Sequence, residues 1–493
     1  MATARIWAIA SGVAALALVA SVGQPASAAP EGSAHASVQV LDIQECKPTV
    51  QANGGSGEWP HLVQLSFAPL PDRLPSSGEV NVTAIFVDFS DAPAQVSTAS
   101  YFRQFIPDGL KIIEDLSYGQ VSFTIDGPHG WFRMPRPSGD YGYFRGMDAE
   151  AHRGLIADAV KVSDSAVDYS RTDAFIIVMP PAMANPGYGV SPAFLADDNF
   201  GVPADGNILK NGTTIGTDWP QQRPLVVAHE LLHTMGLVDL YKMNSTPPLN
   251  SDVGEYVGTY SIMSVYGDSP PPLFAWERWV RGWLRDDQVT CLGLGIHDIA
   301  LGSIVNPSRG QAMSVVPLGG TRYLSIEARG PVGKQRVTRQ GVIPYIVDPS
   351  IPTGEGPIRV PQRQPGQPMS PLATGATVAV EGIGVEVRSA RNGLFNIRIH
   401  NPVPPATSPG APGSVKVTRV FSGSVISWAE PLNTGWSAVT GYEVRWNGGS
   451  WQTTSQRSLP VQRGQAGKPL TFEVRALNAV GPGPIASIRV PGR

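Results

Sequence analysis

The chain has 493 residues, with 37 lysines and arginines against 40 aspartates and glutamates and a formal net charge of −3. Its length exceeds that of a typical single domain, so we expect about two to four domains. The near-neutral charge, without a block of like charges, argues against nucleic acid or an anionic membrane surface as the partner.

Residues 1–28 have the pattern of an export signal. Arg5 supplies a positive charge, an apolar run follows, and Ala26 and Ala28 are the small residues of a cleavage site that we place after Ala28. The alternative is an uncleaved membrane anchor, but the apolar run is short for a membrane span. No later segment has the length and hydrophobicity of a span. We therefore expect a secreted, extracellular protein without stable membrane insertion.

The next part of the chain mixes strand and helix patterns. Residues 29–77 show little periodicity and are interpreted as a propeptide. Residues 78–290 then predict an α+β (mixed α/β) domain. Its expected strands lie at 80–89, 119–127 and 173–180, its expected helices at 99–117 and 149–163, and a long polar loop at 191–218.

All-β domains are expected after this point. Residues 291–401 contain short strand patterns separated by glycine and proline, which predict a β-rich accessory domain. Residues 402–412 are a proline-rich linker. In residues 413–493, the order of Trp428, GYEVRW and FEVRALNAVGPGP resembles fibronectin type III domains. One departure is Leu470, which stands where those domains usually have a tyrosine.

The stretch VVAHELLHTMGLVDLYKM, residues 226–243, carries the candidate site. His229 and His233 are four residues apart, so a helix brings both imidazoles to one face, with Glu230 beside them. Two such imidazoles can bind Zn²⁺, and the glutamate can act as the general base. Gly236 allows a sharp turn after the helix, which makes Asp239 the expected third metal ligand.

Two other interpretations of this stretch are disfavoured. A helix whose histidines have no function is disfavoured because Gly236 and Asp239 follow at the expected steps. A structural zinc site is disfavoured because Glu230 would have no role and no cysteine cluster is present.

A second stretch, GTYSIMSVYG at residues 258–267, supports the zinc interpretation. Its Met263 resembles the Met-turn of the metzincin metallopeptidases, a turn that forms a hydrophobic floor beneath the metal. Tyr266 is a candidate catalytic residue that could donate a hydrogen bond to the developing oxyanion. We also expect residues 191–218 to form part of the rim of the substrate cleft.

From about residue 80 to 348 the chain resembles the immune inhibitor A-like family of secreted bacterial metallopeptidases. The resemblance is carried by AIFVDFSDAP (84–93), SYGQVSFTIDGPHGWFRMP (117–135), AHELLHTMGLVDLY (228–241) and PPLFAWERWVRGWL (271–284). It implies a zincin-like catalytic domain, zinc-dependent endopeptidase activity on protein substrates, export as a zymogen, and accessory β domains.

Within that motif, the resemblance implies metal binding by His229 and His233 and a base role for Glu230. Asp252 and Glu255 remain alternatives to Asp239 as the third ligand. No dense acidic loop indicates calcium, so a Ca²⁺ site is left open without support.

The only two cysteines, Cys46 and Cys291, allow two arrangements. A disulfide between them would tie the N-terminal segment to the end of the catalytic domain. Alternatively, the Cys46 thiolate could occupy the open zinc position and keep a zymogen latent, which would leave Cys291 free. The sequence leaves both arrangements open.

The leading interpretation is therefore a secreted zinc endopeptidase with Glu230 as general base. The alternative from another class is a non-catalytic secreted binding or adhesion protein with a vestigial metal site. In either case the C-terminal β domain is a candidate for contact with a cell surface or polymer.

Overall fold

The computed structural model describes most of the chain beyond its first segment. The described residues are 38–50, 62–243, 252–266, 271–305, 310–331, 340–364, 366–420, 423–461 and 469–490. The predicted export signal at 1–28 and part of the predicted propeptide lie outside them. Among these described ranges, no helix has the length and hydrophobicity needed to cross a membrane.

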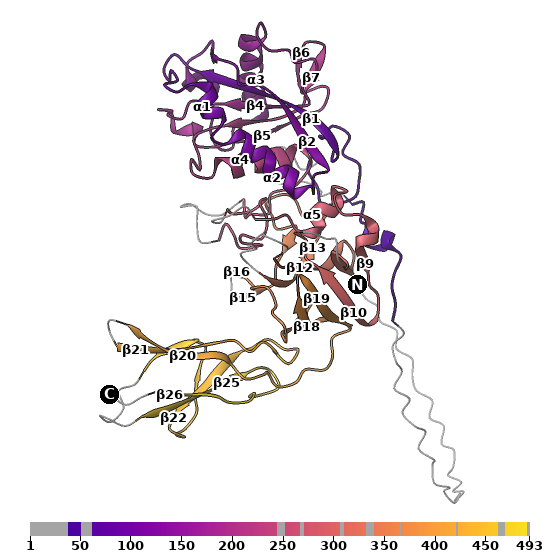
Figure 1. Ribbon diagram of the computed structural model, residues 1–493, viewed down its shortest axis with the longest axis vertical. Coiled ribbons are helices and arrows are strands. Elements are labelled where there is room, and N and C mark those ends of the chain that lie inside the picture. Colours follow the sequence, from indigo (N-terminus) through magenta and orange to yellow (C-terminus); the bar gives the residue numbers. More distant parts are fainter. Residues whose placement is uncertain are drawn as a thin grey trace, which may run out of the picture. The chain divides into compact units, whose positions relative to one another are not determined.

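A six-stranded sheet with helices on both faces forms the first part of the fold (Figure 1). Its order is β2-β1-β4-β8-β5, and β3 also pairs with β1. Every pair is parallel except β5 with β8, which is antiparallel. The strands are β1 (Gly78–Asp88), β2 (Val121–Asp126), β3 (Trp131–Arg133), β4 (Ala174–Val178), β5 (Ala193–Leu195) and β8 (Asn211–Ile215).

The helices cover the two faces of this sheet, and successive side chains of β1 point to opposite faces. Ala84 and Phe86 share a core with α2 and α4, whereas Ile85 and Val87 share a separate core with α3. The helix predicted over 99–117 is divided in two, because Pro107 lacks an amide hydrogen and suits a first turn. The helices are α1 (Thr98–Phe102), α2 (Ile106–Leu116), α3 (Ala149–Ser163) and α4 (Arg223–Thr234).

The prediction of one polar loop over 191–218 is wrong. This segment contains β5, β6 (Val202–Ala204), β7 (Asn207–Leu209) and β8, and β8 is buried along its whole length. The two threonines of β8 find hydrogen-bond partners inside the protein. Thr213 donates to the carbonyl oxygen of Pro192 at 3.1 Å, and Thr214 bonds Nε2 of His152 at 2.8 Å. Polar composition therefore did not indicate exposure here.

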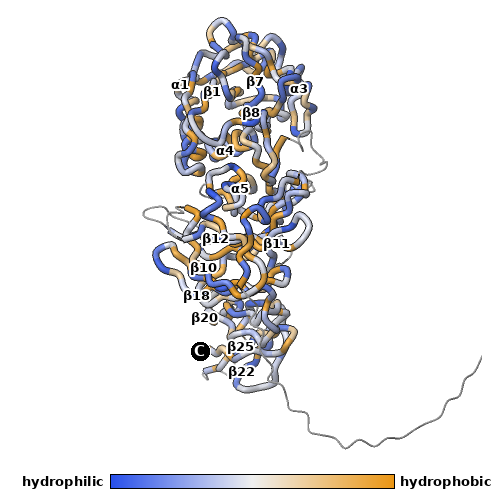
Figure 2. The backbone as a smooth tube through the Cα atoms, turned by 90° about the vertical axis from the view of Figure 1, so that its right-hand side faces the viewer, coloured by the Kyte–Doolittle hydropathy of each residue, from blue (hydrophilic) through white to orange (hydrophobic). Residues whose placement is uncertain are grey.

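Two further sheets make up the β-rich part. One has the order β14-β13-β12-β11-β9 and the other β10-β19-β18-β17. Figure 2 shows hydrophobic stretches near β11 and β12, as expected for strands that are largely buried. The strands are β9 (Val289–Cys291), β10 (Gly295–Gly302), β11 (Met313–Gly319), β12 (Arg322–Arg329), β13 (Gly341–Val347), β14 (Ile358–Arg359), β17 (Thr377–Val380), β18 (Ile383–Arg391) and β19 (Leu394–Asn401).

Several short elements complete these parts. They are α5 (Ala275–Val280), the strands β15 (Gln362–Gln364) and β16 (Gln367–Pro368), and the 3-10 helices η1 (Ile43–Cys46), η2 (Ser138–Tyr141), η3 (Pro186–Tyr188) and η4 (Asp286–Gln288). One hydrophobic core continues from α2 and α4 through α5 into β11, β12 and β13. The α/β part and the β-rich part therefore share a core, and the sequence boundary at 290 does not separate two independent cores.

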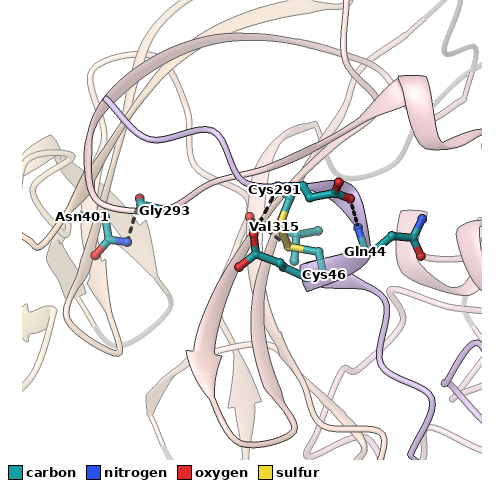
Figure 3. Close-up of a disulfide and its surroundings, with 8 residues drawn as sticks. Gln44, Cys46, Cys291, Gly293, Val315 and Asn401 are labelled. Carbon is teal, nitrogen blue, oxygen red and sulfur yellow. Dashed lines mark hydrogen bonds between the residues drawn. A yellow bond between two sulfur atoms is a disulfide. The ribbon is translucent and has the colours of Figure 1, made fainter. Parts of the chain in front are cut away.

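The described part of the N-terminal segment is built into this core. Val63 and Leu65 are buried, and the carbonyl oxygen of Leu65 accepts a hydrogen bond from the Trp276 indole at 2.8 Å. Cys46 forms a disulfide with Cys291, with their Cα atoms 5.9 Å apart (Figure 3). Of the two arrangements open from the sequence, the structure thus contains the disulfide, in which Cys46 has no thiolate to offer a metal.

Residues 413–490 form a β-sandwich. Its sheets have the orders β20-β21-β24 and β23-β22-β25-β26. Trp428 lies between them, with its ring centroid 5.6 Å from those of both Tyr442 and Phe472. This strand order and central tryptophan define a fibronectin type III-like domain. The strands are β20 (Gly413–Val420), β21 (Gly423–Ala429), β22 (Gly441–Trp446), β23 (Gln452–Thr454), β24 (Ser458–Pro460), β25 (Leu470–Leu477) and β26 (Ala486–Val490).

Candidate metal centre

Helix α4 carries both histidines of the candidate site. Pro224 lies in its first turn, where the missing amide hydrogen costs no intrahelical bond. The helix ends at Thr234, and Gly236 follows with φ +90°. A Cβ at this glycine would also lie 2.5 Å from Leu70 Cδ1. The positive φ therefore favours glycine here, and this conformation lets the chain turn sharply after the helix.

Three ligand atoms converge at this place. Nε2 of His229 lies 3.1 Å from Oδ1 of Asp239, Nε2 of His233 lies 3.2 Å from the same oxygen, and the two Nε2 atoms are 3.2 Å apart. Donor atoms about 2.0–2.1 Å from one tetrahedral ion lie roughly 3.3 Å from each other. Among the residues that the structure describes, these three side chains form the group able to hold a metal ion.

The other ring nitrogens explain why a cation fits this group. Nδ1 of His229 lies 2.8 Å from the carbonyl oxygen of Ile262, and Nδ1 of His233 lies 2.8 Å from that of Leu237. A carbonyl oxygen only accepts, so each Nδ1 carries the hydrogen and donates it. In neutral imidazoles both Nε2 atoms then present lone pairs towards each other and the Asp239 carboxylate. A bound cation would satisfy all three acceptors.

In the absence of a cation, a proton takes a similar position. Burial alone lowers the pKa of His233, but the carboxylates of Asp239 and Glu230 outweigh this effect and raise the pKa to about 9. The carboxyl group of Asp239 responds in the opposite sense: despite its burial, the two imidazoles hold its pKa well below the usual value. A proton and a metal ion therefore compete for Nε2 of His233.

The two alternative carboxylates from the sequence lie elsewhere. Asp252 and Glu255 bind the ammonium group of Lys242 at 3.1 and 2.7 Å. Neither belongs to the group of converging ligand atoms around His229. The geometry thus favours Asp239 as the third ligand.

Glu230 lies next to the two histidines on α4, where desolvation has the largest effect on its carboxyl group. Burial raises the pKa of Glu230 to about 7; the imidazoles of His229 and His233 act against this shift, and Asp239 and Asp218 add to it. A carboxyl group with a pKa near neutrality can both accept and donate a proton at physiological pH. This is the property required of a general base that later acts as an acid.

The turn that carries Met263 is hydrogen-bonded to His229 and to the segment that follows α4. Met263 is fully buried, and its carbonyl oxygen accepts a hydrogen bond from the amide of Leu240 at 2.7 Å. The preceding carbonyl, that of Ile262, holds His229. The turn is itself fixed by Ser261, whose hydroxyl donates to the buried carboxylate of Glu277 at 2.8 Å.

Two tyrosine rings lie against His229, and a tryptophan lies against one of them. The ring of Tyr266 meets that of His229 edge-on, with centroids 5.8 Å apart, and burial raises the pKa of Tyr266 well above its ordinary value. Its hydroxyl therefore stays protonated and can donate. Tyr241 stacks on His229 at 6.3 Å, and the exposed Trp219 contacts Tyr266 at 5.9 Å. Neither Tyr241 nor Trp219 was expected from the sequence, although both flank the stretch that carries His229 and His233.

Comparison with known proteins bears on the C-terminal sandwich. No protein-family model and no curated protein matches the chain. Similar solved structures include a human fourth fibronectin type III domain (21% identity, 18% of this chain and 83% of that chain, TM-score 0.17). Another is the sixth such domain of human fibronectin type III domain containing protein 3 (23% identity, 18% and 92%, TM-score 0.16). The FN5 domain of Drosophila Lar is a third (23% identity, 17% and 99%, TM-score 0.14). These TM-scores carry no argument alone, so the fibronectin type III-like assignment rests on the strand order given above.

Proposed function

We propose that the protein is a secreted zinc endopeptidase of the immune inhibitor A-like type, with a zincin-like catalytic domain. The observation that carries this proposal is the convergence of His229, His233 and Asp239 within 3.2 Å, next to the carboxyl group of Glu230. A structural zinc site would have no use for Glu230, whereas a hydrolytic site requires such a base.

In this proposal the two histidines and Asp239 hold one Zn²⁺, which would polarise the scissile carbonyl and lower the pKa of a bound water. Glu230 accepts the proton of the attacking water and passes it to the leaving nitrogen. The hydroxyl of Tyr266 donates to the oxygen on which negative charge develops. Met263 and its turn keep the His229 ring in place through the Ile262 carbonyl.

The remaining parts of the chain receive secondary roles. Export and synthesis as a zymogen follow from the resemblance of the chain to its proposed family. The fibronectin type III-like domain is a spacer or a site of contact with a cell surface or polymer. The substrates are proteins or peptides that can enter the centre beside α4.

The test is hydrolysis of casein, an unstructured protein, by the wild type and by Glu230→Ala. Each is assayed with added zinc and with a chelator, before and after limited proteolysis of the N-terminal segment. Loss of hydrolysis with either the substitution or the chelator supports the proposal. Equal behaviour of both proteins in all assays, with zinc bound to each, would instead favour the non-catalytic binding protein.

A further inference from the structure

The third proposed ligand, Asp239, is held by a loop from the β-rich part. Its amide donates to Oγ1 of Thr353 at 2.8 Å, and its carbonyl oxygen accepts from the amide of Gly354 at 2.9 Å. A further bond joins the same segments, since the amide of Met243 donates to the carbonyl oxygen of Gly354 at 3.0 Å. Thr353 and Asp239 are 114 residues apart in the sequence.

This loop, residues 348–357 between β13 and β14, is held in shape by its own hydrogen bonds. The carboxylate of Asp348 accepts from the hydroxyls of Thr321 and Ser350 at 2.7 and 2.6 Å. The Asp348 amide donates to the carbonyl oxygen of Pro357 at 2.8 Å, which closes the base of the loop. We call residues 348–357 the Asp239 clamp.

Close packing fixes the clamp against the segment that follows α4. Gly354 has φ +71°, and a Cβ there would lie 2.6 Å from the Cβ of Met243. A residue with a side chain would thus be strained and would separate the two segments. The glycine allows the backbone contact on which the neighbouring Thr353 hydroxyl depends.

The position of Asp239 explains why such support is needed. It lies beyond the end of α4, so the helix that fixes His229 and His233 does not fix its backbone. A carboxylate ligand must be aimed correctly, and partners outside the ligand set commonly provide that aim. Hydrogen bonds to both the amide and the carbonyl of Asp239 restrain the backbone on each side of its Cα.

We propose that Thr353 is a positioning residue that aims Asp239 at the metal, and that the Asp239 clamp makes the β-rich part a component of the metal centre. This inference rests on the proposed function, because it takes the centre to be a zinc site. It goes beyond that function by assigning a role in metal binding to residues outside the α/β part.

The test compares zinc affinities, measured by competition with a chromophoric chelator, for the full-length wild type, Thr353→Val and Thr353→Ser. The valine variant keeps the shape and loses the hydroxyl, so we expect its zinc affinity to fall by about 10–100-fold. The serine variant keeps the hydroxyl and should stay within about threefold of the wild type. If the valine variant fails to fold by circular dichroism, Thr353→Ala replaces it.

The same comparison in an Asp239→Ala background separates positioning from general damage. If Thr353 acts through Asp239, adding Thr353→Val to Asp239→Ala causes no further loss of zinc affinity. An equal loss in both backgrounds, or unchanged affinity of the single valine variant, would overturn the clamp while leaving the zinc site intact. A wild type that binds no zinc would overturn the proposed function, and the clamp with it.

Discussion

Nδ1 of His229 lies 2.8 Å from the carbonyl oxygen of Ile262, the residue before Met263. This bond fixes the tautomer of the imidazole, because the carbonyl can only accept, and so leaves Nε2 free to act as a ligand. It also joins α4 to the turn at 261–264. The proposed metal centre therefore depends on two segments that are distant in the sequence.

Removing a proposed ligand should abolish zinc binding and hydrolysis together. We expect His233→Ala to weaken zinc affinity by more than about 100-fold, because only two of three ligands remain. The measurement is metal content after dialysis, together with casein hydrolysis. His129→Ala is the matched control, since His129 pairs with Asp126 at 3.3 Å and lies outside the ligand group. Zinc retained in full by the His233 variant would contradict the site.

Zinc affinity should depend on pH because protons compete for His233. The net effect of burial and of the carboxylates of Asp239 and Glu230 raises the pKa of His233 to about 9 in the metal-free protein. Below that pH the ion must displace a proton, so affinity should fall by about tenfold for each unit that the pH decreases. Above the pKa of His233, zinc affinity should depend less on pH. Chelator competition between about pH 6 and pH 10 measures this slope, and a constant affinity would refute it.

Glu277 should stabilise the turn at residues 261–264, which bonds His229. Its fully buried carboxylate accepts from the Ser261 hydroxyl at 2.8 Å and the Phe274 amide at 2.7 Å. Glu277→Ala leaves these donors without an acceptor, so we expect a loss of about 2–3 kcal/mol in the free energy of unfolding. Urea denaturation of the wild type and the variant measures this difference in the free energy of unfolding. Glu277→Gln keeps one acceptor oxygen, so its free energy of unfolding should fall less than that of Glu277→Ala. A larger fall in the glutamine variant than in the alanine variant would argue against this account.

The disulfide makes a specific prediction about activation. If a protease cleaves the chain between Cys46 and Val80, the N-terminal fragment should stay attached to the rest of the protein through the disulfide between Cys46 and Cys291. Electrophoresis should show one band without reductant and two with it. In Cys46→Ser the fragment should separate in both conditions, and stability should fall by about 2–5 kcal/mol. Two bands from the cleaved wild type without reductant would show that the disulfide is absent.

Trp219 should contribute to substrate binding. Its ring is 58% exposed beside Tyr266, and its φ of +43° is unusual for a residue with a side chain, as is found at functional sites. We expect Trp219→Ala to raise KM several-fold for peptides with an apolar residue beside the scissile bond and to change kcat by less than about twofold. The KM of Trp219→Phe should lie between those of the wild type and of Trp219→Ala. A change in kcat alone would contradict a role in binding.

Parts of this structure that depend on local sequence could be predicted from it. The four-residue spacing of His229 and His233 places both on one helix face whatever surrounds the helix. Gly236 predicted the turn after α4, because few other residues adopt its positive φ. The apolar runs at residues 80–89 and 173–180 predicted the strands β1 and β4, because such runs are typical of buried strands. The proline-rich stretch before residue 413 predicted a linker ahead of the C-terminal sandwich.

Contacts between distant segments were decided by the tertiary structure. The sequence left Asp239, Asp252 and Glu255 as alternative ligands; in the structure Asp239 lies at the two histidines, whereas Asp252 and Glu255 pair with Lys242. The polar strand β8 was mistaken for a loop because its threonines find partners only in the folded core. The pairing of Cys46 with Cys291 and the bond from Asp239 to Thr353 likewise join residues far apart in the chain. Backbone periodicity determines which residues share a face of one element, whereas packing between elements determines which partners those residues meet.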